Sequence, residues 1–335
     1  MPSRHSVSAN GSLFSAHAGE TLLDAALLGG VEFPHDCRTG RCGTCLVRVR
    51  EGTTLGGESG QPAMVLACQA RVLSNLKVEY DVLPPVARVA GRLDSLIDLS
   101  GDVVELSIRP SAPLAMLPGQ YCRVAFQGHP ARAYSPTAPV GRAAQSDTIS
   151  LHVQRVPGGR VSSRLGQAIS AGHRLTIEGP FGTAFHRPNR NERLVLASRG
   201  TGFAPIFAVA NAALRENWQR EMVLVAGART LEALYMPAAL GRLSAAPNVA
   251  VIATVEEPQI HSRLVRHGPV PDNLPPLDGG DIVYVAGGYR LVETIVRAAL
   301  DAGAGVYYDK FDTAEAANAT GQPRSLWSKA ATWLN

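Results

Sequence analysis

The sequence lacks the features that would place the chain in a membrane or on nucleic acid. No apolar run approaches the ~18–20 residues that a membrane-spanning helix needs. The net charge of +4 is spread along the chain without a basic block, so we expect no nucleic-acid partner. The first residues lack the apolar core and cleavage pattern of a signal peptide. These absences predict a cytoplasmic protein.

Cysteine is scarce and unevenly placed. Of five cysteines, four fall between positions 37 and 68, and three of those lie within nine residues. Cytosolic thiols stay reduced, so we expect no disulfides, and the clustering indicates a metal site. The fifth, Cys122, has no partner motif and is expected to be an ordinary buried cysteine.

The spacing of the clustered cysteines predicts the kind of metal site. Residues 37–45 read Cys-Arg-Thr-Gly-Arg-Cys-Gly-Thr-Cys, and a fourth cysteine follows some twenty residues later. This C-x4-C-x2-C pattern is that of plant-type [2Fe-2S] clusters. A structural zinc site, the alternative, usually shows two C-x2-C pairs, and only one is present. The expected cluster ligands are Cys37, Cys42, Cys45 and Cys68.

Three regions differ in texture and predict three domains. Residues 1–82 mix short β-like runs with one helical run at 21–30, as in an α+β ferredoxin (β-grasp) domain, and prolines at 84 and 85 mark a linker. Residues 86–186 hold short alternating runs punctuated by Gly and Pro, which suits an antiparallel β-barrel. In residues 190–335, apolar strands at 194–197, 222–226, 249–254 and 282–286 alternate with helical runs. That alternation predicts an α/β doubly wound parallel sheet, with a tail in which 326–334 forms a short helix.

Two motifs in the second region fit a flavin when taken together. The first is Arg132-Ala-Tyr-Ser135, and the second runs from Val153 through Gly158-Gly159 to Ser162. Alone, a tyrosine on a strand is more often packing, and Gly-Gly is usually a turn. In the first motif, the arginine can neutralise the diphosphate, the tyrosine ring can lie on the isoalloxazine, and the serine hydroxyl can reach a flavin nitrogen. The turn in the second motif then offers backbone amides to phosphate.

The third region begins with a nucleotide-type turn. After the apolar run at 194–197 comes Ser198-Arg-Gly-Thr-Gly-Phe-Ala-Pro205, and a helical run follows. A glycine-rich turn from strand to helix places a diphosphate at a helix N-terminus, although this one is not the G-x-G-x-x-G fingerprint.

With these motifs the sequence resembles the ferredoxin–NADP reductase superfamily over residues 86 to 311. The resemblance implies that Arg132 binds the FAD pyrophosphate, that Tyr134 stacks on the flavin, and that Ser135 acts in catalysis near the flavin N5. It also implies FAD contacts from Val153, Gly158, Gly159 and Ser162.

The same resemblance implies a nicotinamide site. Gly200, Thr201 and Gly202 would face the nicotinamide and its ribose, and Arg229 would contact the adenosine half. Gly287 lies where relatives have Cys-Gly-Pro. Thr201 and Phe311 are the further catalytic candidates, with core packing an equal alternative for the Phe311 ring. Arg199 replaces a family glycine, and contact with a cofactor phosphate or with solvent both stay open.

A cluster domain placed before such a reductase resembles the reductase components of bacterial multicomponent oxygenases, such as those of naphthalene and benzoate dioxygenases. The resemblance implies electron flow from NADH, with NADPH possible through Arg199 and Arg229, to FAD, to the cluster and on to a terminal oxygenase, directly or through a separate ferredoxin. A Rieske-type aromatic ring-hydroxylating dioxygenase is the favoured acceptor. The alternatives are a diiron monooxygenase, a deoxysugar dehydratase system, or a redox sensor without turnover.

Overall fold

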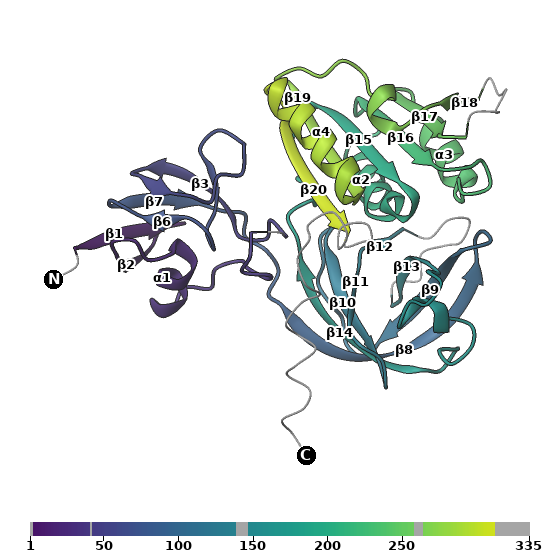
Figure 1. Ribbon diagram of the computed structural model, residues 1–335, viewed down its shortest axis with the longest axis horizontal. Coiled ribbons are helices and arrows are strands. Elements are labelled where there is room, and N and C mark those ends of the chain that lie inside the picture. Colours follow the sequence, from purple (N-terminus) through teal and green to yellow (C-terminus); the bar gives the residue numbers. More distant parts are fainter. Residues whose placement is uncertain (1–2, 41, 139–146, 258–263, 312–335) are drawn as a thin grey trace.

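A computed structural model describes residues 3–40, 42–138, 147–257 and 264–311. Its three main sheets form three units, and the N-terminal unit lies beside the other two (Figure 1). Among the described residues, no helix combines the length and the apolar character that a membrane crossing requires. The helix expected at 326–334 lies outside the described residues.

The N-terminal unit is a mixed sheet with one helix packed on it. Its strand order is β2-β1-β7-β3-β5, and β1 pairs with β7 in parallel. Helix α1 (Leu22–Leu28) is capped by the Thr21 side chain and buries the apolar side chains of its first turns in a core shared with Cys45 and Cys68. The strands are β1 (Arg4–Ala9), β2 (Ser12–His17), β3 (Leu46–Glu51), β5 (Met64–Leu66) and β7 (Leu76–Glu79), with a separate pair β4 (Thr54–Leu55) and β6 (Arg71–Val72).

The second unit is a seven-stranded antiparallel sheet that one short segment closes into a barrel. Strand β11 pairs with β10, and β12 pairs with β13 at the other end of the strand order. Only Ser135 separates β11 from β12, so the segment that carries the flavin motif joins both edges. The strands are β8 (Ala87–Asp98), β9 (Val103–Pro110), β10 (Tyr121–Phe126), β11 (Arg132–Tyr134), β12 (Pro136–Thr137), β13 (Ile149–Gln154) and β14 (Arg174–Phe181).

The third unit is a parallel sheet of order β18-β17-β16-β15-β19-β20. Alternate residues of β15 enter two cores: Leu194 and Leu196 join the core with α2 and α3, and Val195 and Ala197 join the one with α4. The strands are β15 (Arg193–Arg199), β16 (Met222–Ala228), β17 (Val249–Val255), β18 (Val265–His267), β19 (Asp281–Gly288) and β20 (Gly305–Phe311). The helices are α2 (Phe203–Glu216), α3 (Pro237–Ser244) and α4 (Tyr289–Asp301). The expected fold class is confirmed.

Candidate active site and electron-transfer junction

The structure brings the four clustered cysteines together as two pairs. In the first pair, the Cys42 amide lies 3.4 Å from the Cys37 sulfur, and the Cys37 amide lies 3.5 Å from the Cys42 sulfur. The Cys42 thiol donates to Cys37 and lowers its pKa to about 4. In the second pair, the Cys45 thiol donates to Cys68 and lowers its pKa to about 6. Each pair therefore holds two sulfur atoms in contact with each other.

This paired arrangement fits a two-iron cluster. A [2Fe-2S] cluster takes two ligands on each iron, whereas a structural zinc ion takes four at one point. The amides of Thr39 and Gly40 point at cysteine sulfurs, and Gly40 has a φ of 77° that a larger residue rarely adopts. The loop thus supplies thiolates and inward amides of the kind a cluster needs.

The segment that closes the barrel carries the predicted flavin residues. The Arg132 side chain is exposed, and Tyr134 is half-buried, with burial raising its pKa to about 12. Ser135 is buried, and its hydroxyl donates to Asp309 Oδ2 of β20 at 2.6 Å. The hydroxyl therefore links the barrel to the last strand of the parallel sheet.

Asp309 is a site residue that the sequence reasoning missed. Burial raises the pKa of its carboxyl to about 6, while the hydrogen bond from Ser135 acts in the opposite direction. In this strand, the sequence pattern predicted only the aromatic Phe311 as a site residue. Phe311 ends β20 half-buried, opposite Gly288 of β19.

The glycine turn that follows β13 is preorganised by its own side chains. Ser162 Oγ accepts from the Val156 amide at 3.1 Å, and the Gly159 amide donates to the Val156 carbonyl. Gly158 has a φ of 71°, and no described atom lies within 4 Å of where its Cβ would stand. The side chain of Val153 lies in the barrel core, so any cofactor contact there would come from its backbone.

The nicotinamide turn packs directly on the neighbouring strand. Residues Gly200–Gly202 form a short 3-10 turn, and a Cβ on Gly202 would stand 2.2 Å from the Ala286 carbonyl oxygen. Gly287 has a φ of 149° and lies against the Arg199 backbone. A small cavity opens at this edge of the sheet, between the turn, the end of β16 and the segment 233–236. Thr201 is half-buried at the turn.

The structure settles what Arg199 contacts. Its guanidinium makes a two-pronged ion pair with Glu256, at 2.7 and 2.9 Å. Arg199 ends β15 opposite Gly227 of β16, and Glu256 follows the end of β17, so the pair spans the end of β16. Arg229 is exposed just beyond β16.

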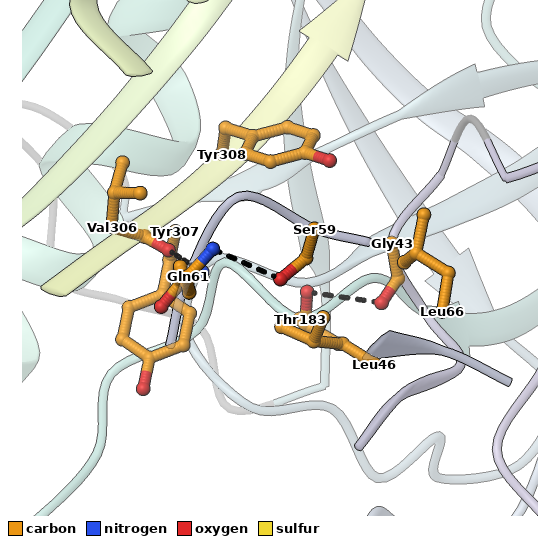
Figure 2. A pocket seen from close by; sticks show the side chains of 9 residues that line it. All are labelled: Gly43, Leu46, Ser59, Gln61, Leu66, Thr183, Val306, Tyr307 and Tyr308. Atoms are coloured by element: carbon orange, nitrogen blue, oxygen red, sulfur yellow. Dashed lines mark hydrogen bonds between the residues drawn. The ribbon is translucent and has the colours of Figure 1, made fainter. Parts of the chain in front are cut away.

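The cysteine loop meets both other units beside a small cavity (Figure 2). The Gly182 amide donates to Thr44 Oγ1 at 3.2 Å, and the Thr183 hydroxyl points at the Gly43 carbonyl. On the other side, Gln61 of the segment between β4 and β5 donates its side-chain Nε2 to the Val306 carbonyl of β20 at 2.8 Å. Thus the strand that bears Asp309 also borders the cysteine loop.

Comparison with known proteins matches three families along the chain. A 2Fe-2S iron-sulfur cluster binding domain matches residues 7–73, an oxidoreductase FAD-binding domain residues 90–186, and an oxidoreductase NAD-binding domain residues 196–297. The reductase component 1 of terephthalate 1,2-dioxygenase from Comamonas sp is 32% identical over 308 residues, which cover 87% of this chain and 90% of that protein. The chain belongs to the oxygenase reductase family.

Other relatives of this oxygenase reductase are also reductase components of oxygenase systems. The naphthalene 1,2-dioxygenase system reductase of Pseudomonas putida is 30% identical over 70% of this chain and 74% of its own. Among solved structures, the Amycolatopsis cytochrome P450 reductase has a TM-score of 0.65 and 28% identity, covering 92% of this chain and 98% of its own. The ferredoxin reductase in carbazole 1,9a-dioxygenase has a TM-score of 0.61 and 25% identity, covering 93% and 99%. The oxygenase reductase therefore carries electrons from NAD(P)H through FAD and a [2Fe-2S] cluster.

Residues from all three units of the oxygenase reductase lie near the contact between the barrel and β20. When bound, FAD accepts the two electrons of a hydride and returns them singly, as a one-electron cluster requires. Ser135 and Asp309 place a hydroxyl and a protonatable carboxyl where the barrel meets the nucleotide unit. The cysteine loop, docked on Gly182 and Thr183, lies beside the same strand. The Ser135–Asp309 pair and the cysteine loop thus lie beside the same strand, β20.

Proposed function

We propose that this reductase supplies a terminal oxygenase, and that the oxygenase is a Rieske-type aromatic ring-hydroxylating dioxygenase. The observation that carries the proposal is the likeness to the terephthalate dioxygenase reductase along nearly the whole of both chains. The proposal includes a cytoplasmic location and domain limits at 1–82, 86–186 and 190–335.

The proposal assigns roles to the predicted residues. The four clustered cysteines hold the cluster, Arg132 neutralises the FAD diphosphate, and the Tyr134 ring lies on the flavin. Ser135, together with Asp309, acts at the flavin edge, where Phe311 covers the ring in the absence of nicotinamide. The remaining contacts come from Val153, Gly158, Gly159 and Ser162 for FAD, and from Gly200, Thr201, Gly202, Arg229 and Gly287 for NAD(P)H.

The test is reconstitution with purified terminal oxygenases and NADH. We expect aromatic product formation to be coupled to NADH oxidation with a Rieske dioxygenase. A second candidate acceptor is a cytochrome P450, because the solved Amycolatopsis cytochrome P450 reductase is 28% identical to this chain. Coupling with a cytochrome P450 alone would favour that candidate. Coupling with a diiron monooxygenase or a sugar dehydratase alone would also contradict the proposal. Failure to reduce cytochrome c with all cofactors loaded would point to a redox sensor.

We further propose NADH as the physiological donor. A 2′-phosphate is recognised by arginine, but Nε and Nη2 of Arg199 both donate to Glu256. Glu256 would therefore compete with a 2′-phosphate for the Arg199 guanidinium.

A Glu256→Gln variant tests the donor preference. We expect the ratio of kcat/KM for NADPH to that for NADH to rise about tenfold, because Arg199 is then released from its charged partner. Glu221→Gln, at the opposite end of β16, is the matched control. An unchanged ratio in Glu256→Gln would exclude the ion pair as the determinant.

A further inference from the structure

Asp36, immediately before the first cluster ligand, is buried against the flavin barrel. Its side chain is only 5% exposed. One carboxylate oxygen accepts from the Tyr121 hydroxyl and the other from the Arg123 guanidinium, both on β10. A carboxylate is costly to bury unless charged or hydrogen-bonding partners compensate it. Here both partners belong to a different unit from Asp36, so the carboxylate is satisfied only when the two units are docked.

The barrel holds these partners in place independently of the cysteine loop. The Tyr121 ring packs on Phe181 with centroids 5.6 Å apart, and it also covers Gly182, where a Cβ would stand 3.0 Å from the ring. The Arg123 guanidinium lies 4.7 Å from the centre of the Phe181 ring. Burial raises the pKa of Tyr121 above its ordinary value, with Cys42 and Asp36 adding to the effect, so the hydroxyl stays a donor. The receptor for Asp36 is therefore preformed.

A second contact holds the loop between its second and third cysteines. Thr44, which lies between Cys42 and Cys45 in sequence, accepts from the Gly182 amide, and Gly182 is next to Phe181. The loop is thus attached to one small area of the barrel both before Cys37 and after Cys42. Asp309, near the flavin edge, is close enough to Tyr121 to contribute to its raised pKa, so the same area adjoins the flavin site.

We propose that Asp36 is a positioning residue for electron transfer from flavin to cluster. Its two hydrogen bonds to β10, together with the Thr44 contact, hold the cysteine loop so that transfer takes place in the docked arrangement without a domain excursion. For each NAD(P)H, the hydride gives two electrons to the flavin, which passes them one at a time to the single cluster. A one-electron acceptor protein reoxidises the cluster between the two transfers, and one proton is released to solvent. The proposal rests on the electron path and is independent of which oxygenase receives the electrons.

The test compares the wild type with Asp36→Ala in the fully loaded protein. Stopped-flow spectra separate flavin reduction by NADH from the later reduction of the cluster. We expect flavin reduction to keep its rate, while cluster reduction slows at least about tenfold and becomes dependent on added glycerol, because docking now limits it. In the wild type, the same step should be independent of glycerol. Glu51→Gln, an exposed carboxylate of the same unit, is the control.

Hydrogen exchange gives a readout that does not depend on turnover. The Gly182 amide, which bonds Thr44, should exchange faster in Asp36→Ala than in the wild type and in the Glu51→Gln control. Unchanged exchange together with an unchanged cluster-reduction rate would overturn the proposal.

A barrel-side variant keeps the test valid if Asp36→Ala does not take up its cluster. Tyr121→Phe combined with Arg123→Met removes both donors and leaves the N-terminal unit unaltered. Electron paramagnetic resonance of the dithionite-reduced protein confirms that the cluster is intact. The double variant should show the same slow, glycerol-dependent cluster reduction. A wild-type rate in this variant would also overturn the proposal.

Discussion

Replacing Asp309 with Asn removes one titratable group from the contact between β20 and the barrel and keeps an acceptor for the Ser135 hydroxyl. In the wild type, burial raises the pKa of Asp309 to about 6. A carboxyl group whose pKa is raised on folding stabilises the fold while it is protonated, and this contribution is lost as the pH rises through the folded pKa. The Asn variant has no such group, so its stability should depend less on pH across this window.

The size of the effect follows from the two pKa values. With a folded pKa of about 6 and an unfolded one of about 3.9, the group's contribution falls by about 3 kcal/mol over the whole titration. Between about pH 5.5 and pH 7.5 the fall is about 0.8 kcal/mol. For a cooperative unit of about 150–250 residues, a fall of about 0.8 kcal/mol corresponds to about 2–3 °C in Tm.

The assay is thermal unfolding of both proteins with all cofactors loaded, at a series of pH values from about 5.5 to 8. The Tm of Asp309→Asn minus that of the wild type should increase with pH by the stated amount. Glu293→Gln, which removes an exposed partner of Lys310, should run parallel to the wild type. Parallel profiles for Asp309→Asn as well would refute the raised pKa, and with it the burial argument for this carboxyl.

Two further substitutions test the nucleotide turn and the cluster. Gly202→Ala should lower the stability by about 1–3 kcal/mol and raise the KM for NADH, because the new Cβ meets the Ala286 carbonyl. By contrast, Gly241→Ala, in helix α3 and with no described atom within 4 Å of its Cβ, should not destabilise the protein and should raise its stability by up to about 1 kcal/mol, measured by thermal unfolding. Cys45→Ser should abolish reduction of cytochrome c while ferricyanide, which takes electrons from the flavin, is still reduced. Cys122→Ala should retain both activities, and equal loss of both in Cys45→Ser would show that cluster and flavin do not act in series.

Continuous apolar runs made the strands of the parallel sheet predictable. Some elements whose sequences mix charged and apolar residues were not predicted. Residues 194–197 are apolar throughout because both faces of β15 are covered, so the run identified the strand. Strand β8 (Ala87–Asp98) was not predicted, since charged and apolar residues share its half-exposed surface. Helix α3 (Pro237–Ser244) was also missed, because it is short and contains a glycine. Burial on both sides leaves a strong signal in the sequence, and a half-exposed element leaves a weak one.

The same contrast applies to the site. Three of the cysteines share one loop, so their spacing alone predicted the cluster. The hydrogen bond from Ser135 to Asp309 joins residues 174 positions apart, and the one from Tyr121 to Asp36 joins residues 85 apart. No spacing rule connects such residues, because their proximity depends on how separate units dock. The sequence therefore predicted the cofactor of each unit and candidate residues within it, but not the contacts between units.

Docking also determines from which side a partner can reach the cluster. Gly43 and Thr44 are buried toward the barrel, and Cys45 and Cys68 are buried in the core of their own unit. Arg38 and Thr39 are exposed in the same loop. Arg38 faces Asp24 at 3.9 Å, an exposed pair that contributes only about 0–1 kcal/mol, so its cation can turn to a partner at little cost. An acceptor that approaches the cluster therefore meets the Arg38 side of the loop, and an acidic contact surface on that acceptor would be attracted there.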